Sequence, residues 1–167
     1  WQPSACPQKQ SQKGSAMTRH HAELLVPHSR QRIFELVAHV EHYPEFVPWW
    51  IAARVTGKHH LIYETEQIMG MGPVRIRFHS QTELHPPDRI IVSSHGGMVK
   101  DLDLTWQFED AAPPPGLVGE ACLVSLDMTL QLSSPRMQAL LAGMEREAAP
   151  KLVRAFADRA DHLYSGH

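Results

Sequence analysis

Cysteine is scarce in this sequence: Cys6 and Cys122 are the only two among 167 residues, too few for a disulfide framework. A run of about eighteen apolar residues, the length that a membrane-spanning helix needs, is also missing. Charge of one sign is not in excess, because the formal net charge is −2 at pH 7, which argues against a dedicated DNA-binding protein. These absences favour a single domain in a reducing, intracellular setting, long enough to bury a hydrophobic core.

The motifs of common catalytic and cofactor sites are absent as well. The sequence contains no Gly-x-Ser-x-Gly elbow, no phosphate-binding glycine loop and no Cys-x-x-Cys pair. Histidine is abundant, with 12 residues, but the adjacent pairs at 20–21 and 59–60 point to opposite faces of a strand. His39 and His42 are spaced for one helix face, yet no acid or cysteine cluster accompanies them. We therefore expect no metal site and no catalytic cofactor.

Residues 1–16 differ in composition from the rest of the chain. They are polar, contain no acidic residue and show no hydrophobic period, which is typical of a disordered extension. The segment has no apolar core as a secretory signal has, and too little arginine for a transit peptide. Met17 could be the natural start, and we expect one domain over residues 17–165.

Alternation of apolar and polar residues predicts that most of this domain is β-sheet. The alternating or apolar segments, separated by turns rich in glycine and proline, are 20–26, 51–55, 61–69, 74–79, 89–94, 101–109 and 122–132. Strands with one polar face form an antiparallel sheet, and a sheet of this size twists and curls. After the first strand, Ser29 is a plausible N-cap for a short helix from Arg30 to about Glu41.

The end of the chain, residues 135–165, has the pattern of one long amphipathic helix. Its apolar residues recur at spacings of three and four from Met137 to Leu163, and Ser134 is the expected N-cap. Pro150 is expected to kink this helix, because proline lacks the amide that donates a backbone hydrogen bond. The predicted fold class is α+β: a curved antiparallel sheet of about six to seven strands around a long C-terminal helix.

A curved sheet beneath a long helix predicts an apolar ligand pocket between the two layers. Methionine is frequent among the apolar residues and favours an adaptable cavity, although a closed hydrophobic core is the alternative. The residues expected to line the cavity and its entrance are Tyr43, Phe46, Trp49, Trp50, Met69, Met71, Phe78, Met98, Leu104, Trp106, Met128, Leu140, Met144, Leu152 and Phe156.

The entrance is predicted at the aromatic segment 42–50 together with the turn at 96–98. Adjacent tryptophans, Trp49 and Trp50, suit the headgroup level of a membrane. The alternative role for this segment is structural, with Tyr43 to Trp49 holding the short helix against the sheet.

Three motifs follow one another in this chain. They are Tyr43-Pro44-x-Phe46-x-Pro48-Trp49, Leu102-x-Leu104-x-Trp106-x-Phe108 and Ala155-Phe156-x-x-Arg159-Ala160-x-x-Leu163-Tyr164. In this order and spacing, over residues 17–165, the chain resembles the coenzyme Q-binding protein family of the START-like (helix-grip) superfamily. It departs from the family at Trp50, where cysteine is frequent, at Met98, where phenylalanine is frequent, and at Pro150 inside the last helix.

The resemblance implies a non-enzymatic carrier that binds a polyprenyl quinone such as ubiquinone and delivers it to respiratory or biosynthetic partners. It implies a location at the membrane periphery, in the bacterial cytoplasm or, in a eukaryote, on the matrix side of the mitochondrial inner membrane. Bacterial members of the family include ribosome-association toxins, so binding to the large ribosomal subunit is an alternative. Polyketide cyclases and aromatases share the fold, and such an enzyme would need polar groups in the cavity, for which Tyr63, Thr105 and His79 are the candidates.

Overall fold

The computed structural model describes residues 19–164, and the predicted extension 1–16 lies outside the described residues. Along the chain the elements are β1 (Arg19–Val26), α1 (Arg30–Ala38), the 3₁₀ helix η1 (Val40–Glu45), β2 (Trp50–His59), β3 (Ile62–Met71), β4 (Val74–His85), β5 (Arg89–Gly96), β6 (Val99–Ala111), β7 (Ala121–Leu132), α2 (Pro135–Leu141) and α3 (Glu145–Tyr164).

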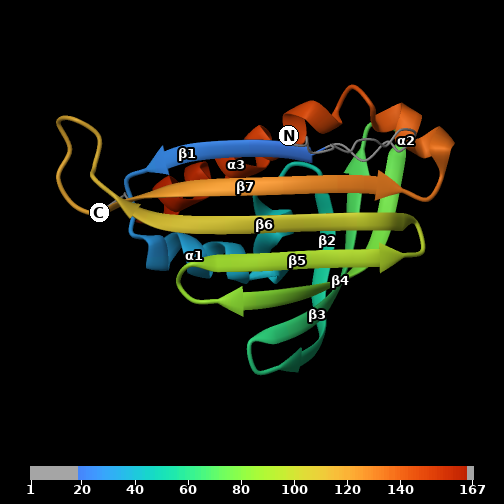
Figure 1. Ribbon diagram of the computed structural model, residues 1–167, viewed down its shortest axis with the longest axis horizontal. Coiled ribbons are helices and arrows are strands. Elements are labelled where there is room, and N and C mark those ends of the chain that lie inside the picture. The colour runs from blue at the N-terminus through green and yellow to red at the C-terminus, as the bar shows by residue number, and fades with distance from the viewer. Residues whose placement is uncertain (1–18, 165–167) are drawn as a thin grey trace, which may run out of the picture.

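The strands form one antiparallel sheet of seven strands in the order β1-β7-β6-β5-β4-β3-β2. Strands β2 to β7 pair as successive hairpins, and β1 pairs with β7 at the other edge. Helices α1 and α3 lie together on one face of this sheet, while α2 lies at one end of it (Figure 1). The predicted α+β class, with a curved sheet and a C-terminal helix against its apolar face, is confirmed.

The alternation in β6 shows why these residues form a sheet with one buried face. Leu102, Leu104, Trp106 and Phe108 are 1–6% exposed, whereas the residues between them on the opposite face are exposed or half-buried. A strand points successive side chains to opposite faces, so this alternation buries one side only. In β7 the register places Met128 beside Leu104, which continues the apolar inner face across the sheet.

The C-terminal segment forms two helices, and the prediction of one long helix is wrong. Between α2 and α3 the chain turns at residues 142–144, where the amides of Ala142 and Met144 bond carbonyls three residues back at 3.2 and 2.8 Å. Gly143 lies in this turn and has a low helix propensity. Pro150 lies inside α3, which runs without a break from Glu145 to Tyr164, so the interruption comes before the proline and not at it.

Helix α3 packs on the sheet through an aromatic cluster around Phe156, which is 1% exposed. The ring of Phe156 meets the rings of Tyr43, Phe46 and Trp106 edge to face, with centroids 5.0, 5.0 and 5.1 Å apart. Such pairs stabilise a core beyond the area that they bury. One α3 side chain therefore joins η1 to the centre of the sheet.

Two buried tyrosines form hydrogen bonds with the end of α1. The helix begins at the predicted cap, where the Ser29 side chain accepts a hydrogen bond from the Arg32 amide at 3.3 Å. It ends at Ala38, earlier than predicted, and the chain continues as η1. The Tyr43 hydroxyl donates to the Val37 carbonyl and the Tyr63 hydroxyl to the Ala38 carbonyl. Because the last carbonyls of a helix lack partners within the helix, these bonds satisfy them.

Candidate ligand-binding site

Within the described residues, two small voids of about 20 Å³ each lie between α3 and the sheet: the first is lined by Met69 and Met128 among others, and the second by Tyr43 and Gln67 among others. Trp50, Leu104 and Leu152 line both voids and divide them. Each void has room for roughly one water molecule. The predicted apolar pocket between the two layers is therefore largely filled in this structure, because aromatic side chains such as Phe156 and Trp106 occupy the concave face of the sheet.

Trp50 belongs to a buried polar cluster that sequence reasoning missed. Its indole Nε1 donates a hydrogen bond of 2.7 Å to Gln67 Oε1. The amide nitrogen of Gln67 donates to Thr65 Oγ1 at 2.8 Å and to Ser80 Oγ at 3.2 Å, and these two hydroxyls are 2.6 Å apart. An indole can only donate, so the amide oxygen must face it. The signal was present in the alternation, because Thr65 and Gln67 occupy inward positions between Tyr63 and Met69.

An open groove of about 900 Å³ runs over the outward side of α3, between β1 and the segment that joins η1 to β2. Its apolar walls include Phe46, Trp49 and Val153. The guanidinium of Arg159 lies 5.2 Å from the centre of the Phe46 ring, a cation–π geometry. Trp49 also lines the first void, so this half-buried side chain separates the groove from the interior.

The structure places only part of the predicted entrance at the groove. Phe46 and Trp49 line the groove, whereas Tyr43 and Trp50 are buried beneath it and bonded to the α1 carbonyl and to the Gln67 side chain. The turn at 96–98 does not line the groove. It lies instead beside α2, because the Ser133 amide donates to the Met98 carbonyl at 2.9 Å.

Ten of the predicted site residues line a void or the groove: Tyr43, Phe46, Trp49, Trp50, Met69, Phe78, Leu104, Trp106, Met128 and Leu152. Phe156 is a core residue, and Met144 is half-buried beside Gly72. Leu140 and Met98 are 50% and 38% exposed, so their assignment to the cavity is wrong. Leu140 belongs to α2, and the turn before α3 takes it away from the interior. The side chain of Met71 lies outside the described parts.

The polar residues predicted for a cyclase do not converge. The Tyr63 hydroxyl bonds the end of α1, and burial raises the pKa of this phenol to about 12. His79 is exposed on the outer face of β4, and Thr105 faces away from Leu104 and Trp106 on β6. Among residues 19–164, no three His, Cys, Asp or Glu side chains gather as metal ligands do. Within the same residues no helix is long and apolar enough to cross a bilayer.

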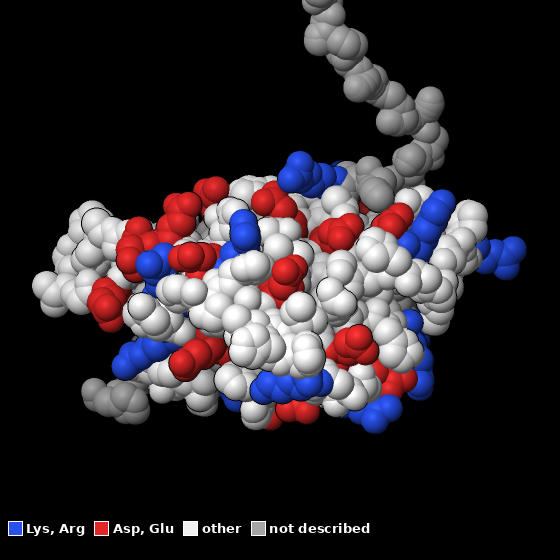
Figure 2. All heavy atoms as spheres, turned by 60° about the horizontal axis from the view of Figure 1, so that its bottom comes forward, with Lys and Arg blue, Asp and Glu red and all other residues white. Residues whose placement is uncertain are grey.

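The outer face of the sheet carries mixed charges. Glu66 is bonded by Arg54 at 2.6 Å and by Arg77 at 3.0 Å, and the hydrogen bond from Arg54 is the main cause that lowers the pKa of this carboxyl. On the face shown in Figure 2, acidic and basic side chains are interspersed and do not form a patch of one sign. This face has the character of an ordinary solvated surface.

The seven-stranded antiparallel sheet packed around a C-terminal helix defines the START-like, helix-grip class of proteins. Residues 26–157 match the family described as polyketide cyclase / dehydrase and lipid transport, and the chain belongs to that family.

Named relatives carry different functions on this fold. The chain is 31% identical to the ribosome association toxin RatA of Pseudomonas aeruginosa, over 84% of this chain and 93% of that protein. It is 24% identical to the mitochondrial coenzyme Q-binding protein COQ10 homolog B of Xenopus laevis, over 90% of this chain and 61% of that protein. The Zhui aromatase/cyclase from Streptomyces sp. R1128 superposes with a TM-score of 0.74 at 11% identity, covering 90% of this chain and 98% of that one. The last likeness shows the fold alone.

Proposed function

We propose that this chain binds a hydrophobic lipid between α3 and the sheet and delivers it unchanged, and that the lipid is a polyprenyl quinone such as ubiquinone. The observation that carries the proposal is the position of Trp49, the side chain that separates the open groove from the first void. A lipid that displaces this side chain passes from the groove to the apolar interior. The family description, which includes lipid transport, and the relative named as a coenzyme Q-binding protein support this ligand class.

The walls of the interior suit an isoprenoid tail. Met69, Leu104, Met128 and Leu152 surround the first void with aliphatic surface. Each methylene group removed from water contributes roughly 0.8 kcal/mol, so a few isoprene units bind without any hydrogen bond. Because each void is only about 20 Å³, the tail must move side chains as it enters. The two methionines are flexible enough to give way.

The proposal is for a carrier and not for an enzyme. Of the candidates for acid–base chemistry, Tyr63 is bonded to the end of α1, while His79 and Thr105 lie on the outer face of the sheet, which supports this choice. A quinone carrier works at the membrane periphery, in the bacterial cytoplasm or on the matrix side of the mitochondrial inner membrane. In this proposal the quinone ring reaches the Gln67 cluster beside the second void, where amide and hydroxyl groups offer hydrogen bonds.

The first test is organic extraction of the purified protein followed by mass spectrometry, which should detect an isoprenoid quinone. A titration with short-chain ubiquinone, followed by quenching of tryptophan fluorescence, then compares Trp49→Ala with wild type. Because the variant lacks the indole that separates the groove from the first void, it should take up quinone faster. The control is Leu117→Ala, which removes an exposed side chain from the β6–β7 loop and should leave uptake unchanged. An extract without lipid, together with no quenching by ubiquinone, contradicts the proposal.

A second candidate is association with the large ribosomal subunit, which the 31% identity to the ribosome association toxin favours. Co-sedimentation with isolated large subunits tests it. Contacts to rRNA phosphates release counterions, so this binding should weaken steeply as salt is raised. Absence of co-sedimentation at low salt counts against this candidate.

A further inference from the structure

A second hollow, separate from the α3 groove, lies at the end of the molecule where α2 meets the sheet. It has a volume of about 710 Å³ and shares no described lining residue with the groove. Its walls come from α2, the start of α3 and the adjacent ends of β1, β6 and β7. Its charged and titratable lining residues are His20, Lys100, Glu145 and Arg146. We refer to this hollow as the α2 cleft.

Glu145 stands between the α2 cleft and the interior. Its side chain is 10% exposed, and of the described residues it alone lines both the cleft and the first void. Gln138 Nε2 donates a hydrogen bond of 2.6 Å to Glu145, and Gln138 Oε1 accepts one of 2.5 Å from the Leu132 amide. His20 Nε2 lies 3.5 Å from the other carboxylate oxygen. One hydrogen-bonded side chain therefore closes the interior at this end.

The surface around the cleft is basic. Lys100, Arg136 and Arg146 are exposed there, while Glu145 is buried. The acids that follow two of these cations in the sequence have other partners. A histidine bonds Asp101 at 2.8 Å, and a lysine one turn further along α3 pairs with Glu147 at 3.1 Å.

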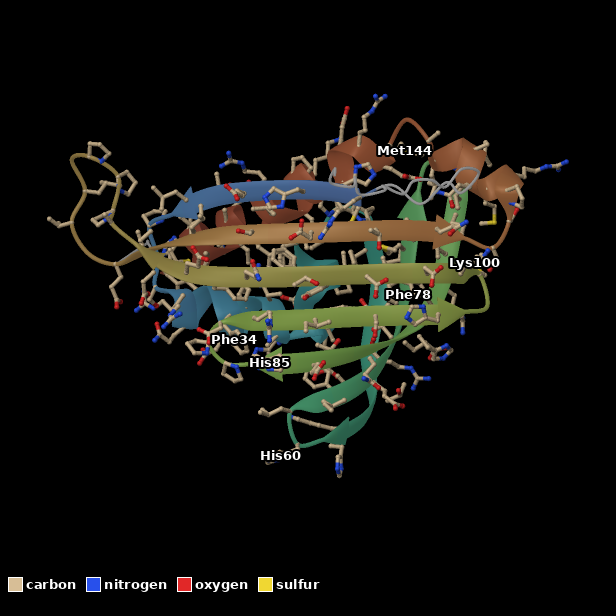
Figure 3. All side chains as sticks on the ribbon, in the orientation of Figure 1. Phe34, His60, Phe78, His85, Lys100 and Met144 are labelled. Carbon is tan, nitrogen blue, oxygen red and sulfur yellow. The ribbon has the colours of Figure 1, made fainter. Side chains whose placement is uncertain are left out.

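Exposed apolar side chains lie at the same end. Leu140 on α2 is 50% exposed and Met98 on the β5–β6 turn is 38% exposed. Ser133 joins the β5–β6 turn to the start of α2, because its amide donates to the Met98 carbonyl at 2.9 Å and its hydroxyl to the Gly97 carbonyl at 2.5 Å. Lys100 lies near this turn at the end of the sheet, close to α2 (Figure 3).

We propose that this end of the molecule, formed by Met98, Lys100, Arg136, Leu140 and Arg146, docks on an anionic lipid bilayer; the inference rests on the proposed lipid-binding function. The apolar side chains enter the interface between headgroups and acyl chains, and the cations pair with the headgroups. Each lysine or arginine near an anionic surface strengthens binding by about fivefold. Charge complementarity therefore selects an anionic bilayer over a neutral one. Docking here brings the first void, closed by Glu145, next to the lipid.

Vesicle flotation tests the docking surface, with phosphatidylcholine vesicles prepared with and without phosphatidylglycerol. The double variant Lys100→Ala/Arg146→Ala should bind the anionic vesicles about 25-fold more weakly than wild type, two steps of about fivefold. Leu140→Ser should weaken binding as well. The matched controls are Lys58→Ala and Leu61→Ser, which remove an exposed cation and a 44% exposed leucine at the β2–β3 hairpin and should bind as wild type does.

Equal binding of wild type and double variant to anionic vesicles overturns the proposal. An equal loss of vesicle binding in the hairpin controls overturns it as well. So does a double variant that loses binding to large ribosomal subunits while its vesicle binding stays intact. All these side chains are exposed, so thermal unfolding followed by circular dichroism should be the same in every variant. A double variant that binds ubiquinone normally but not vesicles supports the docking surface. A wild type that docks through these residues yet never binds quinone supports it too and contradicts only the quinone ligand.

Discussion

Trp50 and Gln67 are joined by a hydrogen bond of 2.7 Å between the indole Nε1 and the side-chain oxygen, beneath α3. The two residues are 7% and 2% exposed. This bond holds the indole between the two interior voids, both of which it lines. A ligand that occupies the interior must therefore move an indole that is both packed and hydrogen-bonded.

Replacement of Gln67 by leucine should destabilise the fold. The Trp50 indole then loses its acceptor while it stays buried, and an unpaired buried donor costs about 1–3 kcal/mol. Urea unfolding of Gln67→Leu measures the loss. In the double variant Trp50→Phe/Gln67→Leu no indole donor remains, so its free energy of unfolding should be higher than the sum of the two single effects predicts. Strict additivity would show that the two side chains are not coupled.

Replacement of Leu152 by alanine should merge the two voids. Leu152 lines both of them and is 3% exposed, so its truncation should cost about 2–5 kcal/mol of stability. The enlarged interior should bind short-chain ubiquinone more tightly in the folded protein. Leu126→Ala is the matched control, because Leu126 is 0% exposed and lines neither void. The control should lose stability without gaining quinone affinity, and equal affinities in the two variants would contradict the role of the voids.

The thiol of Cys122 should be unreactive in the folded protein. The side chain is 0% exposed, and burial is the main cause that raises the pKa of this thiol to about 12. The reactive thiolate is therefore scarce near pH 8. In a Cys6→Ser variant, Ellman's reagent should show no reaction at pH 8 until urea unfolds the chain. Fast labelling of the native variant would contradict the buried position.

His21 should titrate above its usual range. The hydrogen bond with Asp127 at 2.8 Å is the main cause that raises the pKa of His21 above 6.5, and the bond with Glu23 at 3.1 Å adds to it. A raised folded-state pKa stabilises the fold fully below the ordinary histidine pKa, and this stabilisation is lost as pH rises through the folded value. NMR titration should find a lower pKa for His21 in Asp127→Asn. An unchanged pKa in that variant would contradict the assigned cause.

The aromatic segment 42–50 shows how much of the site local sequence patterns can predict. Its four aromatic side chains were predicted as one entrance, and the structure divides them by depth. Phe46 and Trp49 reach the groove, while Tyr43 and Trp50 are held inside by the α1 carbonyl and the Gln67 amide. A sequence pattern identifies apolar side chains but not their distant hydrogen-bond partners, which arrive from other elements.

The segment that forms α2 and α3 shows a second limit of prediction from sequence. Spacings of three and four continue from Met137 through Gly143 to Leu163, so periodicity alone predicts one helix. The turn at 142–144 lets α2 lie against the end of β7 while α3 follows the sheet, and it leaves Leu140 exposed. The break depends on where β7 ends in space, which a helical repeat does not encode.

The sequence by itself determined the strands, their buried face and the cap of α1, because alternation and capping act between residues close in the chain. Only the tertiary structure decided how much space remains inside. That volume depends on side chains from distant elements, such as Phe156 of α3 against Tyr43 of η1 and Trp106 of β6. Close packing of such side chains left two voids of about 20 Å³ where an apolar ligand pocket was predicted.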